Sequence, residues 1–259
     1  VVLNYRFNDA IMGYASYASG FKSGGYAGTA STEISARTPF DQEEADAFEV
    51  GLKGDLLDDR LRLNVAVFST DYTDLQVLVR KEAFPGDPLG IVVTENAADA
   101  TSQGVEVEFT AVLGGGFQIS GNYAYLDATY DEYLEPNGID NAGNRLRNAP
   151  ENAYTLVGSY ETELGNGGMF NARYEYIYSD ERFQDPREEA SAAIPDYSLS
   201  NLNLMYTSPG GQYQVSGWVR NMFDEEYLLH NFPLAPFGYP GTIGMPRMYG
   251  ATVTVNFGG

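Results

Sequence analysis

Apolar and polar side chains alternate along most of this 259-residue chain. Near the C-terminus Val253, Val255 and Phe257 alternate with polar residues, and the segments 105–111 and 170–179 repeat the pattern. Successive side chains of a β-strand point to opposite faces of a sheet, so a period of two predicts strands with one apolar and one polar face. The pattern therefore predicts an all-β fold.

Eleven strands can be placed on this pattern, and the connections between them alternate in length. The predicted strands cover residues 1–7, 10–19, 44–56, 60–79, 100–113, 117–130, 152–164, 168–179, 197–207, 212–222 and 247–257. Tight turns rich in Gly, Asn and Asp fall at 8–9, 57–59, 114–116, 165–167 and 208–211. Long connections occupy about 20–43, 80–99, 131–151, 180–196 and 223–246. All tight turns then share one end of the sheet, as in outer-membrane barrels, whereas Greek-key crossings would mix the two kinds.

Composition narrows the classes of protein. The formal net charge of −21 disfavours nucleic acid as a partner, because phosphate binding requires basic patches. The chain has no cysteine and hence no disulfide framework or thiolate site. No apolar run reaches the roughly 18 residues of a membrane-spanning helix, but a barrel strand needs only about 9–11 residues with one side facing lipid. A membrane barrel and a soluble all-β domain both fit these numbers.

A few segments depart from the alternation. Residues 11–15 are apolar on both faces, and residues 41–47 could form one helical turn. Phe68 falls in register with the polar residues Arg62 and Asn64. Either a β-bulge re-aims its ring, or the ring packs on the polar side of the sheet.

Several segments, in order along the chain, resemble the barrel of TonB-dependent receptors. They are 17–26 (YASGFKSGGY), 48–54 (FEVGLKG), 60–68 (RLRLNVAVF), 71–77 (DYTDLQV), 96–108 (NAADATSQGVEVE), 219–227 (VRNMFDEEY) and 246–250 (PRMYG). The resemblance covers the whole chain and implies an antiparallel up-and-down transmembrane β-barrel of 22 strands, of which about eleven are present. Residues 1–259 would then be the C-terminal part of that barrel in the outer membrane of a Gram-negative bacterium, without the plug domain and the N-terminal barrel strands.

The same resemblance implies an active transporter for a scarce nutrient, with a ferric siderophore as the first expectation and glycans or cobalamin as other cargo. Its implied partners are the TonB-type energy-coupling machinery, through the upstream part, the barrel-assembly machinery and outer-membrane lipid. Phe257 resembles the C-terminal aromatic residue of such barrels, although Gly258 and Gly259 follow it. A passive porin or adhesin barrel and a soluble carbohydrate-binding β-sandwich are the alternatives.

Ligand contacts are expected in the long loops, where aromatic rings can stack on a ligand and paired arginines can hold an anionic chelate. The candidates are Tyr26, Tyr133, Arg145, Arg147, Phe183, His230, Phe237 and Tyr239. Each has a simpler role: loop aromatics also pack loops together, arginines pair with nearby acids, and a single histidine without a second ligand is a poor metal site.

The remaining polar residues predict structure rather than chemistry. Eight polar residues are expected to face the barrel lumen, where they would pair across strands or contact a plug. They are Arg62, Asn64, Glu106, Glu108, Arg173, Glu175, Asn201 and Asn203. Asn221 and Asp224 are expected to satisfy backbone groups where a strand ends. The acidic stretches 41–46, 131–135 and 180–189 lack the calcium-loop pattern and suit solvated loops. No catalytic motif, metal site or cofactor is predicted, and the chain is not expected to be an enzyme.

Overall fold

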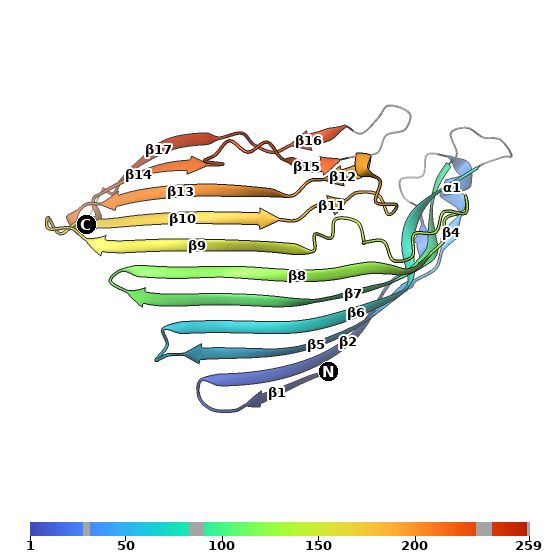
Figure 1. Cartoon of the computed structure of the whole chain (residues 1–259), viewed down its shortest axis with the longest axis horizontal. Helices are drawn as coiled ribbons and strands as arrows, with labels where there is room; N and C mark the ends of the chain where they lie inside the picture. The colour runs from blue at the N-terminus through green and yellow to red at the C-terminus, as the bar shows by residue number, and fades with distance from the viewer. Residues whose placement is uncertain (28–31, 83–90, 232–239, 258–259) are drawn as a thin grey trace.

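The structure is a computed structural model that describes residues 1–27, 32–82, 91–231 and 240–257. Eleven strands form one antiparallel sheet in which each strand pairs with the next one along the chain (Figure 1). They are β1 (Val2–Arg6), β2 (Ile11–Lys22), β5 (Glu43–Leu56), β6 (Leu61–Lys81), β7 (Ile91–Gly114), β8 (Phe117–Tyr133), β9 (Asn152–Glu163), β10 (Met169–Ser179), β13 (Tyr197–Thr207), β14 (Tyr213–Arg220) and β17 (Met248–Val255). This up-and-down order confirms the predicted meander and excludes a two-sheet sandwich for the described residues.

Smaller elements lie in the long connections. Three two-stranded sheets pair β3 (Gly25–Tyr26) with β4 (Pro39–Phe40), β11 (Arg182–Phe183) with β12 (Ala193–Ile194), and β15 (Leu228–Asn231) with β16 (Gly241–Ile243). One 3₁₀ turn, Ala190–Ala192, also lies in a long connection, whereas a second, Pro209–Gly211, forms the tight turn between β13 and β14. The helix α1 (Glu33–Arg37) begins after Thr32, whose hydroxyl accepts the backbone N–H of Ser35 in a capping box.

No helix in the described part of the chain is long and apolar enough to cross a membrane. The helical turn expected at 41–47 is absent, because β5 starts at Glu43 and its backbone groups pair with those of β2 and β6. Tertiary pairing overrides the local preference of an acidic, alanine-containing run.

The tight turns have the backbone that their residues predict. Leu57, Asp58 and Asp59 all have positive φ between β5 and β6, and Gly114, Gly115 and Gly116 do so between β7 and β8. Such φ values suit tight hairpin turns. The tight turns lie at the left end of Figure 1 and the long connections at the right.

The two faces of the sheet differ as predicted. Large apolar side chains on one face remain 41–65 % exposed, among them Leu52, Val67, Leu156, Leu204 and Val253. Aromatic rings border this apolar face at both ends. On β10, Phe170 near the turn end and Tyr178 near the loop end are eight residues apart on one face, or about 27 Å along the strand. Because barrel strands are tilted by about 35–45°, this separation spans roughly 19–22 Å of height, close to the apolar band of about 25 Å between two aromatic girdles.

Phe68 does not require a bulge. The pairing of β6 with both neighbours is continuous from Leu61 to Tyr72, so Phe68 stays on the polar face. Its ring lies over Gly104, its register partner on β7, where an added Cβ would be 2.9 Å from the ring. The bulge interpretation is therefore wrong, and the glycine leaves room for the ring.

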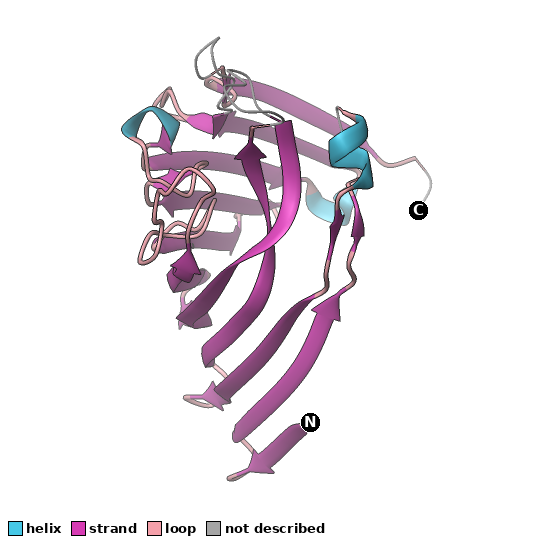
Figure 2. Ribbon diagram, turned by 90° about the vertical axis from the view of Figure 1, so that its right-hand side faces the viewer, coloured by secondary structure: helices cyan, strands magenta, loops and turns pink. Residues whose placement is uncertain are grey.

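Two strands are longer than predicted. The interval 80–99 was expected to be a loop, but β6 runs to Lys81 and β7 begins at Ile91. Register shifts between Tyr72 and Gln76 bend this hairpin, and Figure 2 shows that it rises at the loop end of the curved sheet. Its apolar residues Val79, Ile91, Val93, Ala98 and Ala100 form the main buried cluster together with Tyr130 and Tyr133 of β8. Burial against β8 keeps these residues in strand conformation, which the local sequence does not reveal.

Candidate ligand-binding mouth and lumenal wall

The polar face of the sheet carries hydrogen-bonded pairs that cross from strand to strand. The side-chain amide of Asn64 donates to Glu108 at 3.2 Å, and that of Asn201 donates to Glu175 at 2.9 Å. Arg173 also forms an ion pair with Glu175, at 3.2 Å. A hollow of about 390 Å³ on this face is lined by residues that include Tyr14, Lys53, Asn64, Glu106, Glu108 and Asn122. The polar pairing therefore follows the sequence prediction and gives the barrel a hydrophilic inner wall.

At the loop end, an ion pair joins the third and fourth long loops. Nε of Arg187 donates to Glu135 at 2.7 Å, and a second guanidinium nitrogen bonds the other carboxylate oxygen. Asn141 donates to the same carboxylate at 3.0 Å, and Glu135 is only 8 % exposed. The guanidinium of Arg187 holds the pKa of Glu135 below its usual value, and the bond to Glu135 raises the pKa of Arg187. A two-pronged pair of this kind fixes the geometry as well as the contact.

Arg145 makes a second cross-link between the same two loops. Its backbone N–H and its Nε both donate to Glu188, at 2.7 and 3.2 Å, and its guanidinium lies 3.6 Å from Glu181. The guanidinium also lies over the ring of Phe183, 4.7 Å from the centroid, in a cation–π contact. The local salt bridge, not a free anion-binding group, is the state of Arg145 in this structure.

The last long loop joins the same assembly through backbone carbonyls. Arg182 donates to the carbonyl of Leu229 at 3.3 Å, and Asn231 donates to that of Ser191 at 2.9 Å. Nearby, Asn221 bonds both the N–H and the carbonyl of Glu225, and Asp224 accepts the N–H of Arg247 at 2.8 Å. The structural role predicted for Asn221 and Asp224 is confirmed. Three loops are thus cross-linked into one preformed wall at the mouth.

Apart from Arg145, the predicted ligand contacts fall into three groups. Tyr133 and Phe183 are buried, at 3 % and 7 % exposure, and pack the loops. Burial raises the pKa of Tyr133, as expected for a phenol withdrawn from water. Three candidates are exposed at the loop end. They are Tyr26, whose exposure is 64 %, Arg147 and His230. Phe237 and Tyr239 lie outside the described residues. The structure therefore favours packing roles for the first group and leaves the second accessible to a ligand.

The mouth contains important residues that sequence reasoning did not single out. Glu135 was one acid of a solvated stretch, yet it pairs with an arginine 52 positions away. Gln184 and Asn148 bond one another between the third and fourth loops. No local pattern identifies such partners, because they meet only when two loops fold together. In the described part of the chain, no group of three or more His, Asp or Glu side chains is arranged to hold a metal ion.

A meander of strands with a lipid-compatible outer face, a polar inner face and all long loops at one end defines the wall of an outer-membrane β-barrel. Residues 1–222 match the family model described as TonB dependent receptor-like, beta-barrel. The chain belongs to this family and is located in the outer membrane of a Gram-negative bacterium.

Relatives and solved structures agree with this assignment. The chain is 31 % identical over 226 residues to the metal-pseudopaline receptor CntO of Pseudomonas aeruginosa, covering 84 % of this chain and 28 % of the relative. It is 24 % identical to the ferric-pyoverdine BN7/BN8 receptor of Pseudomonas putida, covering 95 % and 26 %. The chain thus spans little more than a quarter of these relatives. The ferric yersiniabactin receptor FyuA of Yersinia pestis shares the fold at a TM-score of 0.81 and 19 % identity, covering 99 % and 36 %.

Proposed function

We propose that this chain is the C-terminal part of a TonB-dependent active transporter that imports a metal chelate, with a ferric siderophore as its cargo. A plug domain and further barrel strands would precede it in the whole protein. The observation that carries the proposal is the family match over residues 1–222, combined with a cross-linked wall of long loops above a polar inner face. The role is binding and translocation, without catalysis.

The cargo class rests on the relatives. Several similar receptors are named for ferric chelates, such as ferric-pyoverdine receptors and the catecholate receptor Fiu of Escherichia coli. Identity is higher, at 30–31 %, to receptors named for metal-pseudopaline. A chelate of a metal other than iron is therefore a second candidate cargo. Exposed Tyr26, Arg147 and His230 are the described side chains that we propose for contact with the chelate.

The partners of the whole protein follow from the same proposal. The energy-coupling machinery would act on the upstream part, and the barrel-assembly machinery would insert the barrel. Outer-membrane lipid would cover the exposed apolar face that carries Leu52, Val67 and Val253. In the described residues β1 and β17 do not pair with each other, so additional strands would have to close the barrel.

Transport by the full-length protein tests the proposal. The complete gene would be expressed in a Gram-negative host that lacks its own siderophore receptors, with and without the TonB-type coupling protein. Growth would be measured under metal limitation with hydroxamate, catecholate and hydroxycarboxylate ferric chelates, and with zinc and nickel chelates. We expect one chelate class to restore growth only in the coupled host. Growth that does not depend on coupling would favour the passive porin instead.

A further inference from the structure

The first long loop contains a break in an otherwise continuous β-ladder. Lys22 pairs with Glu43 at the end of the β2–β5 ladder, and Gly25 pairs with Phe40 at the start of the β3–β4 ladder. The register is the same on both sides of the break. Residues 23–24 and 41–42 between the two ladders are not in strand conformation. Two residues of each chain segment therefore leave their ladder bonds unmade at the base of the loop.

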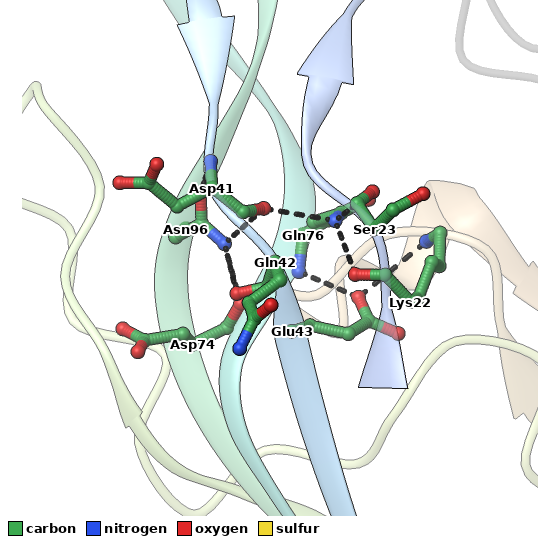
Figure 3. Close-up of polar contacts among 8 residues, drawn as sticks. All are labelled: Lys22, Ser23, Asp41, Gln42, Glu43, Asp74, Gln76 and Asn96. Carbon is green, nitrogen blue, oxygen red and sulfur yellow. Dashed lines mark hydrogen bonds and ion pairs between the residues drawn. The ribbon is translucent and has the colours of Figure 1, made fainter. Parts of the chain in front are cut away.

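Two amide side chains from the β6–β7 hairpin form hydrogen bonds with backbone groups at this break (Figure 3). The side-chain nitrogen of Gln76 donates to the carbonyls of Lys22, Ser23 and Asp41, at 3.4, 3.2 and 3.0 Å. It thereby bonds both segments of the break at once. The backbone N–H of Gln76 also donates to Glu43 at 2.9 Å.

Asn96, the register partner of Gln76, bonds the second segment. Its nitrogen donates to the carbonyls of Asp41 and Gln42 at 3.0 and 3.2 Å, and its oxygen accepts the N–H of Asp41 at 2.7 Å (Figure 3). It also donates to the carbonyl of Asp74 at 2.8 Å, in the bent part of β6 where Asp74 has positive φ. The bend in the hairpin and the break in the loop thus meet at one set of contacts.

The fit at the break is close. A Cβ on Gly24 would lie 2.5 Å from the carbonyl oxygen of Phe40, so only glycine allows the two segments to approach this far. Beyond the break, β4 and α1 contact β7, which lies beside them at the loop end in Figure 1. Without the amide bonds, residues 23–24 and 41–42 would have the backbone freedom of a hinge, because few ladder bonds restrain them.

We propose that residues 23–24 and 41–42 form a hinge and that Gln76 and Asn96 lock it. In this arrangement the two amides are positioning residues: they hold β3, β4, α1 and the exposed Tyr26 at the mouth as one body with the β6–β7 hairpin. Gln76 lies in the segment 71–77 and Asn96 in the segment 96–108, both of which resemble the receptor family. The lock would give these two segments a mechanical role. The lock is a property of the fold, so its test does not depend on which chelate the protein transports.

Isosteric substitutions test the lock in the full-length receptor purified in detergent. Asn96→Asp and Gln76→Glu keep the shape but replace a donor by an acceptor that faces carbonyl oxygens. Hydrogen exchange would be followed by mass spectrometry on peptides covering 20–27 and 32–43. Because a typical hydrogen bond shifts an equilibrium by about 2- to 13-fold, we expect exchange there to rise about tenfold or more. Peptides covering 48–54 and 61–68 should keep their parental exchange.

A matched control is Gln212→Glu, which adds the same charge at an exposed turn at the opposite end of the sheet and should change neither set of peptides. If Asn96→Asp does not yield folded receptor, Gln76→Glu carries the same test, since Asn96 remains in place. Parental exchange in 20–27 and 32–43 would overturn the proposal. So would an equal acceleration in 48–54, because this would mean a general loss of barrel stability.

Discussion

At the scale of single residues, glycines opposite aromatic rings give the inner wall its shape. Tyr14 lies over Gly51, Phe68 over Gly104 and Trp218 over Gly250, and each pair consists of register partners on adjacent strands. A ring that packs over a glycine covers the neighbouring backbone and helps to fix the register of both strands.

Gly104 offers the sharpest test of these pairs. A Cβ at this position would lie 2.2 Å from the carbonyl oxygen of Tyr125 and 2.9 Å from the ring of Phe68. We expect Gly104→Ala to destabilise the barrel by about 1–3 kcal/mol, as overpacking does in protein cores. Guanidinium unfolding followed by heat-modifiable migration measures the change. Gly20→Ala is the control, since a Cβ there has no neighbour within 4 Å.

Glu135 links the loops in a way that depends on pH. Its pKa is lowered in the folded protein from an ordinary value of 4.5. A lowered pKa means that the contribution of Glu135 to stability is complete above pH 4.5 and is lost as the pH falls further. We expect protease cleavage within 131–151 and 180–196 to be slow at pH 7 and to accelerate below pH 4.5. An acid-stable protease would be used throughout.

Glu135→Gln provides the comparison for the acid experiment. The variant loses the charge-assisted bonds to Arg187, at a cost of about 2 kcal/mol in the stability of the loop assembly. Its loops should be cleaved faster at pH 7, with less further change in acid. An unaltered acid response in this variant would assign the titration to another group.

At the scale of elements, the β6–β7 hairpin extends well beyond the membrane. β6 has 21 residues and β7 has 24, whereas about 9–11 suffice to cross a bilayer. The residues beyond the membrane-spanning length form the buried cluster with Tyr130 and Tyr133. They also include Gln76 and Asn96, which bond the first loop. The hairpin therefore connects the first loop to the start of the third.

Val79 tests whether this cluster holds the hairpin. It is 2 % exposed, and removing its two methyl groups should cost about 2 kcal/mol. We expect amide exchange at the end of the hairpin to rise about 30-fold in Val79→Ala, since about 1.4 kcal/mol corresponds to a factor of ten. Leu78→Ala is a matched control on the other face of the same strand, where the side chain is 62 % exposed. Equal effects of the two changes would argue against a packed hairpin.

At the scale of the whole molecule, the chain is strongly acidic. The chain carries a net charge of −21. Three basic side chains of the mouth are paired with carboxylates, in the pairs Lys22–Glu43, Arg145–Glu188 and Arg187–Glu135. From this net charge we expect a negative potential at the mouth, which would attract cations and repel anions over about 8–10 Å at physiological salt.

The rate of ligand association should therefore depend on salt with a sign set by the charge of the chelate. We expect added salt to slow the association of a positively charged chelate and to speed that of a negatively charged one. Stopped-flow fluorescence on the full-length receptor at 20 to 500 mM salt measures both rates. An anionic chelate that associates more slowly as salt is added would mean that the parts of the mouth outside the described residues reverse the potential.

The sequence by itself determined the eleven strands, the direction in which their faces point and the end at which each connection lies. These properties depend on local periodicity and on turn residues such as Gly114–Gly116, so the chain displays them without its tertiary contacts. The inner-wall pairs between Asn64 and Glu108 or Asn201 and Glu175 also follow from strand order.

Only the tertiary structure decided which loop residues are buried and which of them bond one another. It buried Tyr133 and Phe183, joined Glu135 to Arg187 and placed Gln76 and Asn96 on the break in the first loop. These hydrogen bonds join residues 35 to 55 positions apart, and no periodic pattern specifies which distant loop segments meet. Their partners are fixed by the shared curvature of the sheet and by the need to satisfy backbone groups that the ladders leave unpaired.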